Sequence, residues 1–159
     1  MTMYTSLRTA LATLLATVTD VGMVHNRERF VVDPAAFLDM FKTTIGGTVQ
    51  IRAWLILRES MQPVEDTVFG ESRHRHVFVL RGFLGFQDSA DTYGTLQALI
   101  DTIIALLDNQ TTLSVSGVIV RGIGPCALRS FEVGQLGSVL AHVAEIEVPI
   151  ETMTALGVA

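Results

Sequence analysis

The chain has 159 residues, of which 49% are hydrophobic and 17% are charged, and its formal net charge is −5. This length suits one domain with a core of its own, and the composition excludes an intrinsically disordered chain, which needs low hydrophobicity and high charge. A single cysteine, Cys126, excludes a disulfide framework and a cysteine-based zinc site, and the acidic balance argues against a general nucleic-acid binder. A lightly charged surface is typical of a subunit that covers part of itself with a neighbour.

Apolar residues near the N-terminus recur every three or four positions and predict an amphipathic helix; they are Tyr4, Leu7, Leu11, Leu14, Leu15 and Val18. Arg8 interrupts the segment and no basic region precedes it, so it is not typical of a signal peptide. No stretch reaches the roughly 18 uninterrupted apolar residues that a membrane-spanning helix needs. We therefore expect a protein without a membrane span, located in the cytoplasm of the cell that produces it.

Residues 23–32 could form a strand or an extended arm. Asp33 and Pro34 then predict a short helix, because aspartate favours the N-cap and proline the first helical position. Gly46 and Gly47 are expected to close that helix.

Residues 48–59 alternate in the way that a strand with one buried face does. One face carries Val49, Ile51, Ala53, Leu55 and Leu57, and the other carries Gln50, Arg52, Trp54, Ile56 and Arg58. Trp54 and Ile56 make the second face only half polar, which indicates cover by a helix or by a second subunit.

Residues 60–72 are predicted to form an exposed loop, with Val64, Val68 and Phe69 either docking onto a partner or folding onto the core. A long strand is expected at 73–86. A helix with a wide apolar face follows at about 92–107, capped by Asp88, Ser89 or Asp91.

The last third of the chain predicts strands at 113–120, 127–133 and 139–149, separated by turns at 122–125 and 134–137. Residues 150–159 form a tail expected either to be mobile or to reach a neighbour. The connections between successive strands are too short for crossovers. The whole chain, 1–159, is therefore predicted to be a single α+β domain with a mostly antiparallel sheet and two main helices packed on one face.

Candidate chemistry is sparse. His74 and His76 share one face of a strand and could share a metal, but a divalent site needs a third protein ligand, and nothing places His25 or His142 nearby. The glycines around Gly124 lack the lysine and the following helix of a phosphate loop. Cys126 has no basic partner and is expected to act as a small buried hydrophobe. Glu145 and Glu147 could pair as acid and base, although solvation on a strand is the default. We predict no catalytic, cofactor-binding or metal-binding residue and no cofactor.

Ten of the eleven cationic residues are arginines, a bias typical of subunit contacts, although GC-rich coding produces it too. Tryptophan and arginine are enriched at the centres of interfaces. The predicted contact residues are Arg52, Trp54, Arg58, Val64, Val68, Phe69, Arg73 and Arg75. The alternative for Trp54 is a place in the core under the first helix.

The stretch from Gly22 to Arg58 carries a resemblance to a known family. A leading helix, then VGMVHNRERF, then DPAAFLDMFK and a strand of the form IRAWLILRES resemble the tail terminator proteins (minor tail, neck-region proteins) of long-tailed bacteriophages. The closing segment VLAHVAEIEVPI is similar to the last strand of that family. The likeness covers most of the chain in order and size, whereas loop 60–72 matches no family pattern.

The resemblance implies a virion protein at the head-proximal end of the tail. In that family six copies form a ring that stops tail-tube polymerisation and joins the tail to a head-neck connector or stopper protein, and the genomic DNA passes through without specific binding. The implied partners are further copies of the chain, the major tail-tube protein and the connector or stopper. Three alternatives stay open: a head-tail stopper or head-completion protein of the neck, a small metal-dependent enzyme that uses His74 and His76, and a small-molecule sensor with a pocket beside helix 92–107.

Overall fold

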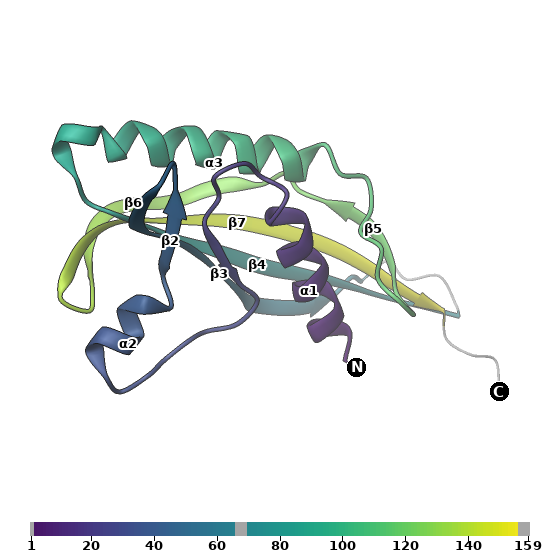
Figure 1. Ribbon diagram of the computed structural model, residues 1–159. Coiled ribbons are helices and arrows are strands. Elements are labelled where there is room, and N and C mark those ends of the chain that lie inside the picture. Colours follow the sequence, from purple (N-terminus) through teal and green to yellow (C-terminus); the bar gives the residue numbers. More distant parts are fainter. Residues whose placement is uncertain (1, 66–69, 156–159) are drawn as a thin grey trace.

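The computed structural model describes residues 2–65 and 70–155 (Figure 1). The helical elements are α1 (Met3–Leu15), α2 (Pro34–Asp39), the 3-10 turn η1 (Asp88–Ala90) and α3 (Thr92–Asp108). The strands are β1 (Met23–His25), β2 (Lys42–Ile45), β3 (Thr48–Pro63), β4 (Glu71–Gly85), β5 (Ile119–Ile123), β6 (Ala127–Leu136) and β7 (Val139–Ala155). None of the helices in the described part is long and apolar enough to cross a membrane.

The seven strands form one sheet in which three long strands, β3, β4 and β7, lie side by side and antiparallel (Figure 1). β1 and β2 pair with the outer edge of β3, and β5 and β6 pair with the outer edge of β7. Only β1 runs parallel to its neighbour. The predicted class, an α+β chain with a mostly antiparallel sheet, is confirmed.

The two predicted helix starts are confirmed in detail. Asp33 accepts a hydrogen bond from the backbone N–H of Ala36 at 2.8 Å, with Pro34 in the first turn of α2. Asp91 is the one of the three proposed caps that begins α3, and its carboxylate accepts from the N–H of Gly94 at 3.1 Å. Both are side-chain acceptors for helix donors that have no partner within the helix.

The prediction for Gly46 and Gly47 was wrong. They do not end a helix but form the two-residue turn between β2 and β3, with φ angles of +57° and +79°. Positive φ at both central residues is what the tightest hairpin turns require, and glycine adopts it without strain. The sequence analysis missed β2 because this strand has only four residues, most of which are polar.

The predicted loop 60–72 was largely wrong. β3 continues to Pro63 and β4 begins at Glu71, and the cross-strand register runs unbroken from Ser60 opposite Val77 to Pro63 opposite His74. Polar residues on a strand end carry no periodic signal, so only the partner strand reveals that they pair. What remains between the strands includes Val64, whose N–H donates to the carbonyl of Arg73 at 3.1 Å.

Two expectations in the last third also change. Residues 113–118 are irregular, and β5 spans the residues around Gly122 that were expected to turn. The expected tail continues β7 as far as Ala155; residues 150–155 pair with β4, and residues 150–153 also pair with β5. Residues 156–159 of the predicted tail lie outside the described part of the chain.

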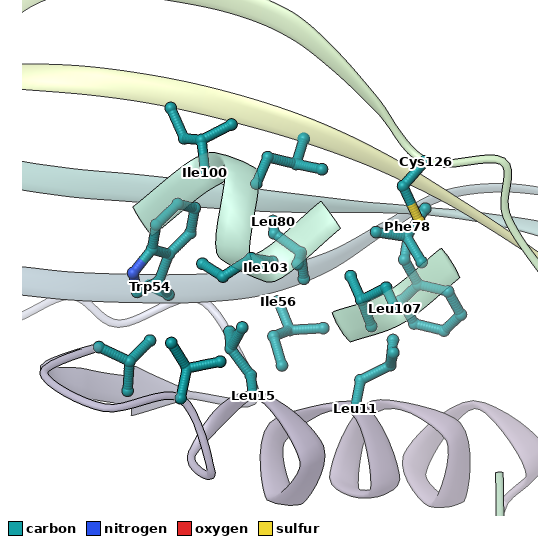
Figure 2. Close-up of a cluster of buried hydrophobic side chains, with 14 of the residues drawn as sticks. Leu11, Leu15, Trp54, Ile56, Phe78, Leu80, Ile100, Ile103, Leu107 and Cys126 are labelled. Atoms are coloured by element: carbon teal, nitrogen blue, oxygen red, sulfur yellow. The ribbon is translucent and has the colours of Figure 1, made fainter. Parts of the chain in front are cut away.

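The buried side chains form two clusters. The first joins α1 and α3 to alternate residues of the long strands, as Figure 2 shows for Leu11, Trp54, Ile56, Ile103 and Leu107. The second lies around Phe41 and Phe83, and contains the residues of β3 that alternate with Trp54. The central part of β3 is therefore buried on both faces.

Candidate functional site

Trp54 is fully buried in the first cluster (Figure 2). Its cross-strand partner is Gly82, and a Cβ at position 82 would lie 2.6 Å from the atoms of its six-membered ring. Trp54 therefore has no surface to present to a partner, and we withdraw it from the predicted contact residues. Its place is the one that the alternative interpretation gave it, in the core of the single chain.

Arg52 is also buried, with 8% of its surface exposed. Its guanidinium donates to the carbonyl of Asp20 at 2.9 Å and to Oε1 of Gln50 at 3.0 Å. Burial lowers its pKa from the ordinary value, and the charge of Asp20 acts in the opposite direction. Arg52 thus ties the segment after α1 to the start of β3, and we withdraw it too from the predicted contact surface.

Arg58 is half-buried and lies against an aromatic ring of α1. Its Cζ is 4.6 Å from the ring centroid of Tyr4, and the Cζ of Arg8 is 4.8 Å from the same centroid. Tyr4 in turn stacks on Phe78 at 6.3 Å. Within the described residues neither arginine forms an ion pair. Arg58 is therefore partly available to a partner, and Tyr4 and Arg8, which the sequence analysis did not select, belong to the same surface.

The other predicted contact residues are not gathered at one place. Val64 is half-buried, and Arg73 is half-buried and pairs with Glu71 at 3.1 Å. Arg75 is exposed beside a hollow of about 300 Å³ bounded by Pro125 and Pro149. The two remaining predicted residues, Val68 and Phe69, lie outside the described residues.

The histidine pair does not complete a metal site in the described part of the chain. No group of three or more His, Cys, Asp or Glu side chains is placed to hold a metal there. His76 is fully buried and its Nε2 lies 3.0 Å from Oγ1 of Thr152. Burial is the main cause that lowers the pKa of His76 to about 4, and the positive charges of Arg58 and His74 add to it. His76 is therefore neutral at neutral pH and part of the core.

The two glutamates that could have paired as acid and base are each engaged by an arginine. Arg81 lies 2.6 Å from Glu145, and Arg129 lies 3.7 Å from Glu147 and 2.6 Å from Glu59. These five side chains surround a hollow or lie at its edge, on the sheet face opposite the first cluster. Each of these carboxylates is therefore paired with a guanidinium group and not with another carboxylate, so the structure does not show the acid–base pair that the sequence left open.

Cys126 is buried in the first cluster, as predicted. Its N–H donates to Oδ1 of Asp108 at 2.8 Å. Burial raises the pKa of the thiol above its ordinary range, and Asp108 adds to that effect. Because the thiolate is the reactive form, this environment does not suit a nucleophile.

The helix α3 does not border a ligand pocket with its apolar face, because that face is buried in the first cluster. A hollow of about 520 Å³ lies instead between α1 and residues 110–116, lined mainly by hydroxyl and small apolar side chains. No titratable side chain lines it, so the hollow suggests no reaction.

An exposed apolar surface, which we call the aromatic patch, lies where α3 begins beside β6 and β7. It consists of Phe86, Tyr93, Phe131, Val133 and Leu140 around the buried His142. Tyr93 lies 5.1 Å from Phe131 and is 57% exposed, and Val133 is 53% exposed and directly opposite His142. The Nε2 of His142 lies 3.0 Å from Oγ1 of Thr92. Burial lowers the pKa of His142, so the centre of the patch is uncharged at neutral pH.

A second exposed apolar surface is the segment 26–32 between β1 and α2, which we call the arm. Phe30 is 78% exposed and Val32 is 87% exposed, the two highest values among the large exposed hydrophobic residues of the described chain. Phe30 contacts only the ring of Phe37 among the aromatic residues described, at 6.1 Å. The sequence analysis considered an extended arm here but did not select its residues. The sequence did contain a signal for this surface: Phe30 and Val32 are apolar, two positions apart, and lie just before the helix cap Asp33.

Comparisons with known proteins give no family for this chain. No protein-family model matches it and no curated protein matches it. Among solved structures, one whose name states no function aligns over 92% of this chain and 90% of its own, with 14% identity and a TM-score of 0.47. A likeness of this size supports no statement about function.

Proposed function

We propose that the chain is a structural subunit of the neck of a long-tailed bacteriophage, a tail terminator. In this proposal its copies close into a ring, six as in the family that it resembles, at the head-proximal end of the tail. The ring ends the tail tube and joins it to the connector or stopper protein. The proposal comes from the family resemblance of the stretch from Gly22 to Arg58 and from one structural observation: two separate apolar surfaces remain exposed on the single chain.

Two surfaces are what a head-to-tail ring needs. In a heterologous contact, one patch of a subunit meets a different patch of the next, so every subunit carries both. The arm exposes Phe30 and Val32, and the aromatic patch exposes Phe86, Tyr93, Val133 and Leu140, each by about half. Large apolar patches on a soluble chain usually mark contact sites. This pair of surfaces supports self-assembly.

The sheet supplies the scaffold in this proposal. We propose that α1 and α3 are the two main helices packed on one face, whose side chains meet in the first cluster. The opposite face carries the arginine–glutamate pairs that include Arg81 and Arg129. The net charge of −5 suits a conduit that lets DNA pass without binding it. A strongly basic ring bore would count against this assignment.

Direct binding to the tail tube tests the proposal. Purified chain should form ring-shaped particles in electron micrographs, alone or on tail tubes, and should retain the major tail-tube protein of the same phage in a pull-down. A stopper or head-completion protein would instead retain the connector and not the tube protein. Stoichiometric zinc, manganese or iron in the purified protein, with loss of the metal on replacing His74, would favour the metal-enzyme alternative and overturn the proposal.

A further inference from the structure

The main chain of the arm forms no backbone hydrogen bond within the part of the chain that the structure describes. Residues 26–32 belong to no helix or strand, and no backbone hydrogen bond joins any of them to another described residue. Unpaired main-chain N–H and C=O groups in a row are the donors and acceptors that a sheet edge can use. The arm leads from β1 into α2 on the outside of the sheet (Figure 1).

The strand β6 has a free edge. It pairs with β7 along Ala127–Leu136, and no described strand pairs with its other side. Most of its residues are exposed. Natural sheets cover or protect such edges, because an exposed edge of this length is a template for another strand.

The side chains of the arm and of β6 alternate in a complementary way. On β6, Phe131 and Val133 belong to the aromatic patch, and Glu132 points to the opposite face and is exposed. In an extended arm, Phe30 and Val32 share one face, and Arg27 and Arg29 share the other. An arm laid on this edge with its apolar face toward the patch therefore brings its arginines to the same face as Glu132.

Within the single chain, the charged side chains Arg27, Arg29 and Glu132 remain available to a partner. Arg27 forms no ion pair, and Arg29 donates only to the sulfur of Met40, at 3.5 Å, among the described residues. Glu132 likewise has no cationic partner there. The arm thus carries an excess of one positive charge, and the edge of β6 carries a carboxylate with no cationic partner among the described residues.

We infer that residues 27–32 of one copy add as a strand to the free edge of β6 of a second copy. Phe30 and Val32 cover the aromatic patch, and Arg27 and Arg29 lie beside Glu132 of the neighbour. Because the arm and the edge are different surfaces of one chain, the contact is head-to-tail and each copy can use both. The inference rests on the proposed function only in naming this contact as the one that joins ring subunits.

The test compares full-length variants by native mass spectrometry and light scattering. The arm variant is Phe30→Asp with Val32→Asp, and the edge variant is Val133→Asp. The control is Val49→Asp, at a residue of β3 that is 64% exposed and belongs to neither surface. Wild type and the control should assemble beyond a dimer at high concentration, and the arm and edge variants should each be monomers.

Mixing gives the decisive result. An equal mixture of the arm and edge variants retains one intact arm and one intact edge, so it should form a heterodimer and nothing larger. Amide hydrogen exchange should show new protection of residues 27–32 and of β6 on assembly, which contact between side chains alone would not produce. A wild type that stays monomeric at every concentration overturns the inference, as does an arm variant that assembles like wild type.

If the Val133→Asp variant does not fold, exchanging the charges of Glu132 and of Arg27 and Arg29 tests the same contact. Glu132→Arg alone should weaken assembly, and Arg27→Glu with Arg29→Glu on the same chain should restore it. If assembly is not restored, the prediction that Arg27 and Arg29 lie beside Glu132 of the neighbour is contradicted. The proposed function fails separately: a wild type that assembles through the arm but does not retain the tail-tube protein contradicts the function and leaves the contact in place.

Discussion

Trp54 and Gly82 lie directly opposite each other on β3 and β4, and the indole fills the space into which a side chain at position 82 would project. A Cβ there would come within 2.6 Å of two ring carbons, closer than side-chain atoms pack. The glycine thus sets how close the tryptophan lies to the sheet.

Gly82→Ala should therefore destabilise the chain. The added methyl group forces either the indole or the strand to move, and overpacking of this kind costs about 1–3 kcal/mol. Denaturant titration measures the loss. Gly122→Ala is the matched control, since nothing lies within 4 Å of its Cβ and its φ is not positive. Equal effects of the two substitutions would contradict the packing described for Trp54.

Trp54→Ala separates the two roles considered for this residue. We expect a loss of about 3–5 kcal/mol of unfolding free energy, because the substitution leaves a cavity between the sheet and α1 and α3. Because this variant lacks the single tryptophan of the chain, its unfolding should be followed by circular dichroism during chemical denaturation. Val49→Ala, on the exposed start of the same strand, should change stability little. A stable Trp54→Ala chain that has lost only self-assembly would return Trp54 to an interface.

Stability should fall as the pH is lowered through the range that His76 controls. Its pKa is lowered to about 4 in the folded chain from 6.5, so between these values the unfolded chain binds more protons than the folded one. The contribution of His76 is complete above pH 6.5 and is lost progressively down to about pH 4, by about 3 kcal/mol in total.

The measurement is the unfolding free energy of wild type and of His76→Gln at a series of pH values. Glutamine can hydrogen-bond to Thr152 but does not titrate, so the slope assigned to His76 should disappear from the variant. Arg58→Gln removes a positive charge that also lowers this pKa, so it should raise the pKa of His76 in the folded chain and reduce the total loss of stability at low pH. Parallel pH curves for wild type and His76→Gln would show that His76 is not the titrating group.

Cys126 should react slowly with thiol reagents in the native chain at neutral pH. Burial and the neighbouring Asp108 raise its pKa, which leaves little thiolate, and the surrounding core excludes the reagent. The rate should rise to that of a free thiol in denaturant. Native reaction as fast as in the denatured chain would mean that the loop 124–126 opens readily or that the thiol is not buried.

How far the sequence predicts this fold is clearest on β3. The alternation from Val49 to Arg58 identified the strand and both of its faces correctly. It could not decide which face the helices cover, because Ile51 and Ala53 on one side and Trp54 and Ile56 on the other are equally apolar. The C-terminal end of the strand was missed for a different reason: Ser60 to Pro63 have no alternating pattern, and their place in the strand is defined by pairing with β4.

For the candidate contact surfaces, too, the sequence predicted one part and only the structure showed the rest. Composition predicted that a neighbour covers part of the surface, which stays a prediction, and the arginine and tryptophan content directed attention to Arg52 and Trp54. Both proved to be buried by contacts with residues distant in the sequence, Asp20 and Gly82. The exposed apolar residues lie elsewhere, on the arm and in the aromatic patch.

The sequence by itself determined the local features of this protein: its α+β character, the cap Asp33, a helix that begins near Asp91, the central parts of the long strands and the buried cysteine. These depend on side-chain periodicity and on hydrogen bonds within three residues, which a linear pattern contains. Only the tertiary structure decided that β3 is buried on both faces, that His76 is in the core and that Phe30 and Val32 are left outside it. Exposure depends on which distant segments cover a residue, and no property of the residue or of its near neighbours carries that information.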